Sequence, residues 1–274
     1  MIMRLIGLAS IAMVGLGVSG SVLASESGSP SNGKAEKVKT PPSFSKTEVQ
    51  FLWGNDLQLG SLAPDTSSVV TITVEHFSTW SLGDNFFFLD IANETDGNTN
   101  TSLYSEGYPY LSISKITGKK LSFGPILDFG PQIGYNAGNN DLVLLYGAKA
   151  YISIPGFEFF NIQTYAYHTV NDPLNRDLNT TFQITTAWSI PIKLSEKIKF
   201  TIQGFTDFIG PQGSGVASQF LTQPQLRLDI GRFLKFSDPA RVQLGFEYSY
   251  WHNKFGVRGV NESAMQAMVV FKLH

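Results

Sequence analysis

The stretch VQLGFEYSY, residues 242–250, alternates large apolar side chains with small or polar ones. Successive side chains of a β-strand point to opposite faces of the sheet, so this stretch predicts a strand with one apolar and one polar face. The same period of two recurs in 70–74, 182–190 and 225–230. The fold is therefore expected to be all-β.

Twelve segments of this kind follow one another from residue 47 onward. They are 47–53, 69–77, 86–92, 107–115, 121–130, 142–154, 157–168, 180–190, 198–208, 220–231, 241–251 and 263–272. The odd-numbered connections between them are expected to be mostly longer than the even-numbered ones, for example 54–68 against 116–120. An even number of antiparallel strands with long and short connections at opposite ends is typical of outer-membrane barrels. Residues 47–274 are thus predicted to form a 12-stranded antiparallel transmembrane β-barrel.

The composition of the chain excludes several other classes. Its 274 residues are 42% apolar and only 15% charged, which is too apolar for a wholly disordered chain. The 26 glycines have no collagen-like period, and the net charge of −2 gives no electrostatic footprint for nucleic acid. The absence of cysteine excludes disulfides, thiol catalysis and cysteine-ligated zinc.

The N-terminus has the organisation of an export signal. Arg4 precedes an apolar stretch, 5–18, and small residues end at Ala24. This pattern predicts a signal peptide over 1–24, too short to be a membrane-spanning helix. Residues 25–46 are rich in Ser, Gly, Pro and Lys, and we expect them to form a disordered polar segment.

Two soluble folds also have period-two strands, a sandwich and a lipocalin, and both would place the apolar face inside. The polar face of this chain consists mostly of Thr, Ser, Gln and Gly with few Lys or Glu, which is unusual for a surface in bulk water. The apolar face carries large aromatic residues towards segment ends, as an aromatic girdle would. They are Phe182, Trp188, Tyr248, Tyr250 and Phe271. Both features favour a membrane barrel with a wet lumen.

The polar phase of each strand then predicts the lumen, or substrate path. Its candidate residues are Glu75, Phe77, Phe86, Phe88, Asp90, Tyr110, Lys149, Asp207, Gln225, Arg227, Asp229 and Glu247. Acidic residues outnumber basic ones in this set, whereas an anion-selective pore needs rings of Arg and Lys. Mixed charge with aromatic rings suits a neutral solute that has a flat face and hydroxyls, and stacking contributes about 1–3 kcal/mol per base. Alternatively, Phe86 and Phe88 simply fill the lumen as packing.

No motif indicates catalysis or metal binding. The four histidines are scattered and show no metal-ligand spacing. Asp96, Asn98 and Asn100 resemble the start of a calcium loop, but the Gly and Glu that such a loop needs are missing. We therefore predict no catalytic residue, no cofactor and no metal.

Five runs together resemble one known family. They are 83–90, 111–125, 154–160, 220–229 and 247–260. The chain resembles, over about 46–271, the nucleoside-specific channel-forming outer-membrane family (Tsx type), and in particular its phage-receptor branch. Of the candidate lumen residues, the matching runs contain Phe86, Phe88, Asp90, Gln225, Arg227, Asp229 and Glu247. The resemblance implies a lumen that passes nucleosides and surface loops that some bacteriophages bind.

We accordingly expect a Gram-negative outer-membrane channel for small neutral solutes, nucleosides above all, without covalent chemistry. Its partners would be the lipid bilayer with lipopolysaccharide, the solute and some bacteriophages, but not nucleic acid. The odd-numbered connections would be extracellular and both termini periplasmic. A surface-contact barrel with a plugged lumen and an outer-membrane lipid hydrolase remain alternatives.

Overall fold

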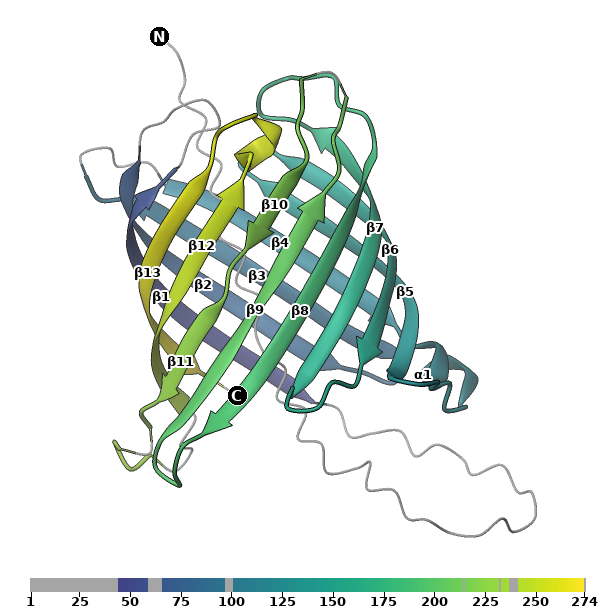
Figure 1. Ribbon diagram of the computed structural model, residues 1–274, viewed down its shortest axis with the longest axis vertical. Helices are drawn as coiled ribbons and strands as arrows, with labels where there is room; N and C mark the ends of the chain where they lie inside the picture. Colours follow the sequence, from purple (N-terminus) through teal and green to yellow (C-terminus); the bar gives the residue numbers. More distant parts are fainter. Residues whose placement is uncertain are drawn as a thin grey trace.

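The computed structural model describes residues 44–58, 66–96, 101–213, 215–231, 233–236 and 241–273. Their strands wind around a common axis as a tilted barrel (Figure 1). The predicted signal peptide, 1–24, and nearly all of the predicted polar segment, 25–46, lie outside these residues. Within the described residues, no helix has the length and apolar character needed to cross a membrane.

The chain forms one antiparallel sheet with short helical turns. The strands are β1 (Ser45–Leu57), β2 (Ser67–Thr79), β3 (Gly83–Glu94), β4 (Thr101–Leu111), β5 (Ile126–Gly138), β6 (Leu142–Ile152), β7 (Phe159–Asn171), β8 (Thr181–Lys193), β9 (Lys199–Ile209), β10 (Gln219–Thr222), β11 (Gln225–Asp229), β12 (Val242–His252) and β13 (Glu262–Lys272). The helices are α1 (Ile113–Thr117) and the 3-10 turn η2 (Lys254–Gly256).

The sheet closes on itself. From β1 to β10 each strand pairs with the next along the chain, as do β11 with β12 and β12 with β13. β1 pairs with β13 from Glu48↔Lys272 to Gly54↔Gln266 and so closes the ring. Strands β10 and β11 both lie between β9 and β12, so they are two halves of one barrel strand. The predicted 12-stranded antiparallel β-barrel is confirmed.

Pro224 interrupts the strand that β10 and β11 share. Proline has no N–H for the ladder, but its carbonyl still accepts a 3.0 Å bond from Tyr248 N. The facing residue is Gly204, where a Cβ atom would lie 2.5 Å from the Gln223 carbonyl oxygen. A glycine at this position therefore lets the irregular strand approach β9.

The predicted strands 107–115 and 121–130 are both displaced. The structure places β4 at Thr101–Leu111 and β5 at Ile126–Gly138, with α1 between them. The Ser112 side chain accepts a 3.0 Å bond from Lys115 N and caps the helix, and Gly118 ends it at φ 65°. Apolar and polar residues continue to alternate in the sequence after residue 111. The strand nevertheless ends there, because the Ser112 cap starts a helix.

The expected alternation of long and short connections is wrong. The β5–β6 connection 139–141, expected to be long, is a tight turn in which Gly138 N donates to the Asp141 carbonyl over 2.9 Å. The connections 112–125 and 230–241, expected to be short, are long. The strands continue past their alternating apolar residues into polar residues at the rim of the barrel. Strand ends predicted from the apolar alternation therefore come too early there.

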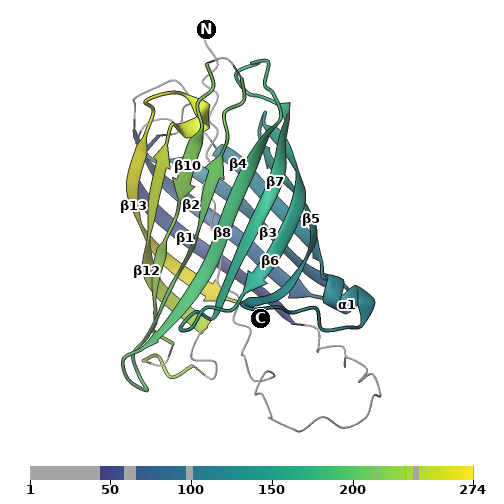
Figure 2. The same cartoon turned by 45° about the vertical axis from the view of Figure 1, so that its right-hand side comes forward.

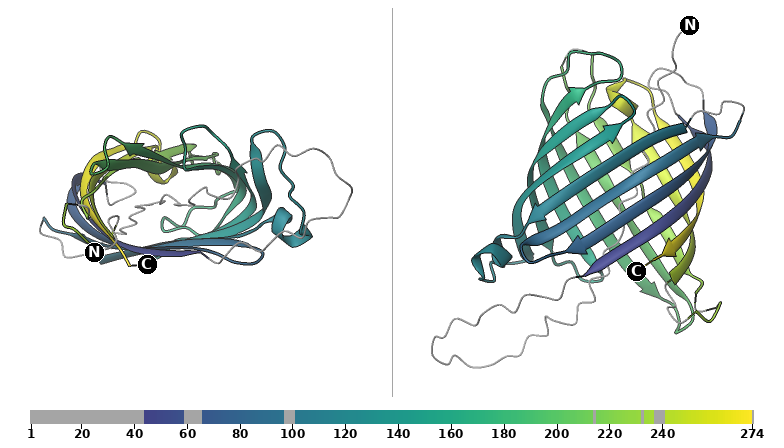
Figure 3. Two further views of the ribbon diagram at one scale, coloured as in Figure 1. Left: turned by 90° about the horizontal axis from the view of Figure 1, so that it is seen from below. Right: turned by 180° about the vertical axis from the view of Figure 1, so that it is seen from behind.

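The two faces of the wall differ in chemistry. Large apolar side chains such as Trp53, Phe87 and Phe246 are exposed on the outside, while the alternate side chains are buried inside. Seen along its axis, the barrel is a flattened ring (Figure 3). A closed barrel with an apolar outer face is a multi-pass protein of the outer membrane.

Both ends of the described chain lie at the same end of the barrel, because β1 begins there and β13 ends there. We call this the terminal end. The connections at the terminal end are 80–82, 112–125, 153–158, 194–198 and 230–241, and α1 projects outward beside the wall there (Figure 2).

Candidate functional site: the barrel lumen

The structure places all of the candidate lumen residues on the inner face of the wall. Phe86 is half-buried, and the others are buried: Glu75, Phe77, Phe88, Asp90, Tyr110, Lys149, Asp207, Gln225, Arg227, Asp229 and Glu247. Their neighbours along each strand point to the lipid side, as Phe87 does between Phe86 and Phe88. Their position is that of lumen residues, and a role in solute passage remains a prediction.

Four of the candidates belong to one network of charged and amide side chains, which we call the Arg227 network. Arg227 on β11 donates from Nη1 to Glu48 Oε1 over 2.6 Å and from Nε to Gln225 Oε1 over 2.8 Å. On one side, Gln50 Nε2 lies 3.1 Å from Glu48 and 3.3 Å from Glu75. The network therefore links β1 and β2 to β11 across two intervening strands.

The other side of the network surrounds the carboxylate of Glu247. Gln225 Nε2 donates to Oε2 over 2.6 Å, and Gln266 Nε2 donates to Oε1 over 2.9 Å. Asp90 lies apart from this network and accepts a 2.5 Å bond from the Thr73 hydroxyl. Both carboxylates line the interior as hydrogen-bond acceptors, the chemistry that sugar hydroxyls need.

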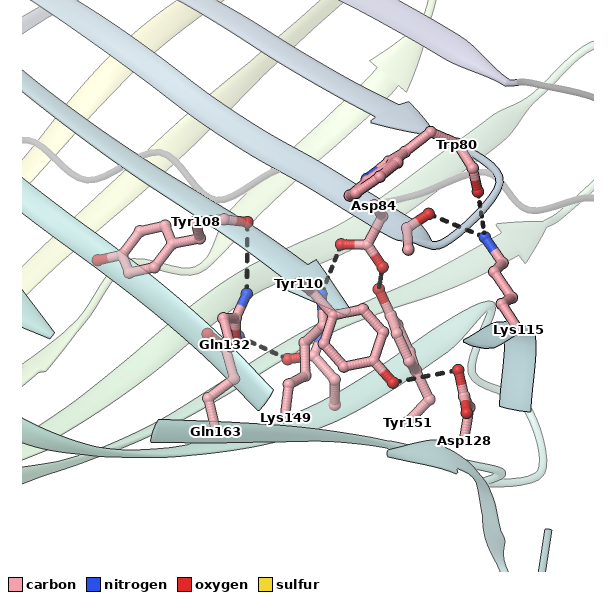
Figure 4. Close-up of polar contacts among 12 residues, drawn as sticks. Trp80, Asp84, Tyr108, Tyr110, Lys115, Asp128, Gln132, Lys149, Tyr151 and Gln163 are labelled. Atoms are coloured by element: carbon pink, nitrogen blue, oxygen red, sulfur yellow. Dashed lines mark hydrogen bonds and ion pairs between the residues drawn. The ribbon is translucent and has the colours of Figure 1, made fainter. Parts of the chain in front are cut away.

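A second polar cluster surrounds Lys149, towards the terminal end (Figure 4). Lys149 Nζ lies 2.7 Å from Asp84 Oδ1 and 4.3 Å from the centre of the Tyr110 ring. The Tyr151 hydroxyl donates to the other Asp84 oxygen over 2.9 Å, and the Tyr110 hydroxyl donates to Asp128 over 3.1 Å. Lys149 Nζ also lies 4.7 Å from the centre of the Tyr151 ring, so it is held by one carboxylate and two aromatic faces.

Glu106 on β4 is the centre of a third cluster. It accepts bonds from the hydroxyls of Tyr104 over 2.6 Å and Tyr108 over 2.7 Å. Nearby, the Tyr165 hydroxyl lies 2.8 Å from Gln132 Oε1. Glu106 is not among the predicted lumen residues because the predicted strand begins at residue 107. Its side chain nevertheless points inward, as do those of Tyr104, Tyr108 and Tyr110.

Asp207 and Asp229 lie outside these clusters. Asp207 accepts bonds from the Thr185 hydroxyl over 2.5 Å and from Gln183 Nε2 over 3.3 Å. Asp229, at the terminal end, accepts a 3.1 Å bond from Gly231 N, so it helps to form the turn that leaves β11.

An apolar cluster, which we call the aromatic cluster, joins opposite walls of the flattened barrel. Its buried members are Phe88, Tyr104, Ala187, Phe205, Leu221 and Trp251, and the partly buried Phe86, Phe159 and Phe255 pack against it. Phe88 and Tyr104 come from β3 and β4, and Phe205 and Leu221 come from β9 and β10. The predicted packing role of Phe86 and Phe88 is therefore present in the structure.

A small cavity lies beside the aromatic cluster. Its volume is about 30 Å³, and its lining includes Phe86, Lys149, Phe159, Asn161 and Gln163. This volume holds about one or two water molecules. The space beside the aromatic cluster on this side of the lumen is therefore of the size of solvent molecules.

At the end opposite the terminal end, the hairpin between β12 and β13 folds over the aromatic cluster. Lys254 is buried with its Nζ 2.5 Å from Glu262 Oε2, and Phe255 packs on Trp251 with ring centres 4.9 Å apart. Asn253 and Phe255 both have positive φ, 49° and 57°. Arg176 Nη1 donates to the Phe255 carbonyl over 2.9 Å and so ties this hairpin to the β7–β8 connection.

Arg176 also sets the ionisation of the carboxyls near it. Burial opposes the ionisation of Asp172, but hydrogen bonds from Arg176 outweigh it and lower the pKa of Asp172. Burial and the nearby Asp172 charge raise the pKa of Asp141 to about 7, with Arg176 opposing the rise. Asp141 therefore titrates near neutral pH at the rim of the barrel.

Acidic side chains outnumber basic ones among the buried charged residues. The acidic set is Glu48, Glu75, Asp84, Asp90, Glu106, Asp207, Asp229, Glu247 and Glu262, and the basic set is Lys149, Arg227 and Lys254. The expected excess of acidic groups therefore extends to residues that the sequence analysis did not select. Within the part of the chain that is described, no group of three or more His, Asp or Glu side chains could hold a metal ion.

Outer-membrane porins are found among the solved structures similar to this chain. No curated protein matches the sequence. Among solved structures, the NanC porin has a TM-score of 0.50 at 13% identity, covering 83% of this chain and 100% of that one. The KdgM porin has a TM-score of 0.47 at 8% identity, covering 83% of this chain and 99% of the porin. At these identities the likeness to NanC concerns the fold alone.

A family profile covers most of the chain. It matches residues 58–268 and is described as "Domain of unknown function (DUF5020)". The matched residues run from just after β1 into β13 and so include most of the barrel. The chain therefore belongs to the DUF5020 family, and it is a member with a porin-like outer-membrane barrel.

Proposed function

We propose that this protein is an outer-membrane channel for the passive, selective diffusion of small neutral solutes, with nucleosides as the favoured class. The observation that carries the proposal is the inner wall of the barrel, where carboxylates, amides and aromatic rings alternate around the lumen. Such a wall offers acceptors and donors for hydroxyls and flat faces for a base. The resemblance of the sequence to nucleoside channels supports the same class.

The charge of the lumen supports neutral over anionic solutes. Another KdgM porin structure is a complex with disordered oligogalacturonate, which is a chain of carboxylated sugars. In this protein the buried acidic residues exceed the basic ones, and such a lumen repels carboxylates. We therefore expect acidic oligosaccharides to permeate poorly.

The aromatic cluster gives passage its selectivity. A solute must separate Phe88 and Tyr104 from the opposite wall, which exposes the faces of their rings. A flat base that stacks on such a ring recovers about 1–3 kcal/mol, while a sugar or an ion of similar size gains less. Several weak contacts in series then allow the solute to leave as readily as it enters.

Single-channel recording in planar bilayers tests the role of the carboxylates. Asp90→Ala and Glu247→Ala each remove an acceptor from the inner wall and should weaken block by added nucleoside about tenfold, as expected for one lost charged hydrogen bond. The salt conductance should stay nearly unchanged. Glu196→Ala, an exposed residue in the β8–β9 connection, is the matched control. Wild-type block in both lumen variants would refute this assignment.

A barrel with a plugged lumen, whose loops serve surface contacts such as bacteriophage binding, is the second candidate. The observation that favours it is the aromatic cluster, which already joins opposite walls. A plugged barrel would show no resolved conductance with or without a nucleoside gradient. Uptake of labelled nucleosides into liposomes that contain the barrel would exclude this candidate.

A further inference from the structure

The two ends of the barrel expose different side chains. Among the described residues, every large apolar side chain that is exposed outside the strands lies at the terminal end. Examples from three connections are Ile116 and Phe123, Leu194, and Phe233 and Leu234. The described connections at the opposite end expose polar side chains instead, such as Asp96 and Asp177.

The connection 112–125 shows this character most clearly. It projects beside the wall through α1 (Figure 2). In this connection, Ile116 is 50% and Phe123 is 62% exposed. Lys115 Nζ holds it against the β2–β3 turn through bonds of 3.0 Å to the Trp80 carbonyl and 2.8 Å to the Gly83 carbonyl. The projection is therefore anchored to the barrel, and its apolar side chains continue the lipid-facing surface of Leu111 and Leu127.

Exposed basic residues accompany the apolar ones at the terminal end. Lys119 and Lys120 lie between Ile116 and Phe123 in the sequence, and both are exposed. Lys197 and Lys235 are exposed in the β8–β9 and β11–β12 connections at other points of the same rim. Apolar side chains next to lysines are the composition of segments that lie in the interface of an anionic membrane.

We infer that the terminal end carries a collar that binds the anionic phospholipid headgroups of the adjoining leaflet, with the connection 112–125 as its principal contact. Ile116 and Phe123 enter the boundary between headgroups and acyl chains, while Lys119 and Lys120 contact the phosphates. The acidic, polar opposite end lacks this composition in its described connections. The inference assigns the terminal end to the phospholipid leaflet of the outer membrane, which agrees with the predicted periplasmic termini.

The absence of cysteine from the chain permits a direct test. A single Ser122→Cys variant of the full chain, labelled with an environment-sensitive fluorophore, is reconstituted in vesicles of phosphatidylcholine with or without phosphatidylglycerol. We expect the emission to shift towards that of an apolar environment when phosphatidylglycerol is present, and high salt to reverse the shift because it screens the lysines. The same label at Asp177→Cys, at the opposite end, should not respond.

Charge variants then identify the contacts. Lys119→Gln with Lys120→Gln should lower the apparent affinity for phosphatidylglycerol by about fivefold per lysine. Arg258→Gln, which removes an exposed charge at the opposite end, is the control. If the lysine variants refold poorly, Ile116→Ser in the labelled background gives an independent reading, because it should reduce the shift without changing the charge.

Several results would overturn the inference. One is an emission of the Ser122→Cys label that does not change with phosphatidylglycerol. The others are an emission shift in the lysine variants as large as in the parent, and an equal shift of the label at Asp177→Cys. A further arm replaces phosphatidylglycerol with lipopolysaccharide. A stronger response of the Ser122→Cys label to lipopolysaccharide would place the terminal end at the other leaflet and so contradict the assignment.

Discussion

At the scale of single residues, the interior is held by charges that satisfy one another. Arg227 and Glu48 are both buried, and each touches amide side chains in addition to its ionic partner. A buried charge without a partner is costly, whereas a complete network is tolerated. At the seam where β1 meets β13, the Arg227 network pairs the buried charges of Arg227 and Glu48, so the loss of one of them should be costly.

Removal of Arg227 tests this claim. Arg227→Met should lower the free energy of unfolding by about 3 kcal/mol, because it deprives the buried Glu48 of its partner. The loss should not be larger, since Lys46 Nζ remains 2.9 Å from Glu48. Urea unfolding in detergent micelles measures the effect. Adding Glu48→Gln to Arg227→Met should recover part of the stability, and a further loss instead would contradict the account.

Asp141 predicts a pH dependence of stability. Its pKa is raised to about 7 by burial, with a further contribution from Asp172, against an ordinary value of about 4. The folded protein therefore keeps the proton that the unfolded chain loses, and the contribution of Asp141 to stability falls as the pH rises from about 4 through 7. Asp141→Asn removes this titration.

Thermal unfolding of the two proteins at pH 4 and pH 8 measures the difference. The Asn variant should gain stability relative to the wild type between these pH values, and the other carboxylates cancel in the comparison. Asp177→Asn, an exposed change on a neighbouring loop, should show no such gain. A gap between wild type and Asp141→Asn that does not vary with pH would rule out a raised pKa.

Many of the residues that line the lumen could be predicted from the sequence. The alternation of polar and apolar residues along a strand is enough to tell which side chains point inward. Glu75, Arg227 and Glu247 were selected in this way and lie inside the barrel. Glu48 and Asp84 are also inward, but Glu48 was not selected from its strand and Asp84 fell outside the predicted one. Their partners come from distant strands, and a local pattern holds no information on such pairs.

At the level of strands, β9 and the irregular strand formed by β10 and β11 approach each other closely at Gly204, which leaves no room for a side chain there. Gly204→Val places carbon atoms against the Gln223 carbonyl and the Pro224 backbone, where a Cβ would already lie at 2.5 and 2.9 Å. We expect a loss of stability of about 1–3 kcal/mol, as for other overpacked sites, seen as a lower urea midpoint.

Gly138→Ala is the matched control for this prediction. A Cβ atom at Gly138 would have its nearest neighbour at 3.5 Å, an ordinary contact. This variant should unfold like the wild type. Equal midpoints for Gly204→Val and Gly138→Ala would show that the strand break does not constrain its neighbour.

Helix α1 and the ends of the strands were not predicted correctly, and for both the reason is that they carry no periodic sequence pattern. Helix α1 depends on the Ser112 cap and the φ of 65° at Gly118, which act within a few residues and carry no periodic signal. The polar ends of the strands also lack an alternating apolar pattern, because backbone hydrogen bonds alone pair them with their neighbours. The order and number of strands were predictable, and their limits and the lengths of the connections were not.

At the scale of the whole molecule, the flattened barrel brings opposite walls into contact. The flattening is seen along the barrel axis in Figure 3. Phe88 and Phe205 are fully buried in the aromatic cluster that joins the two walls. This contact depends on the shape of the closed ring, so no property of a single strand predicts it. The cluster narrows the lumen at its own level, so the proposed channel should conduct weakly and select by shape.

Planar-bilayer recording of the wild-type protein beside Phe205→Ala tests whether the lumen is a solute path that the aromatic cluster narrows. We expect small, resolved conductance steps for the wild type that added nucleoside reduces, and larger steps with weaker block for Phe205→Ala. If both proteins are folded and neither conducts, the lumen is not a solute path.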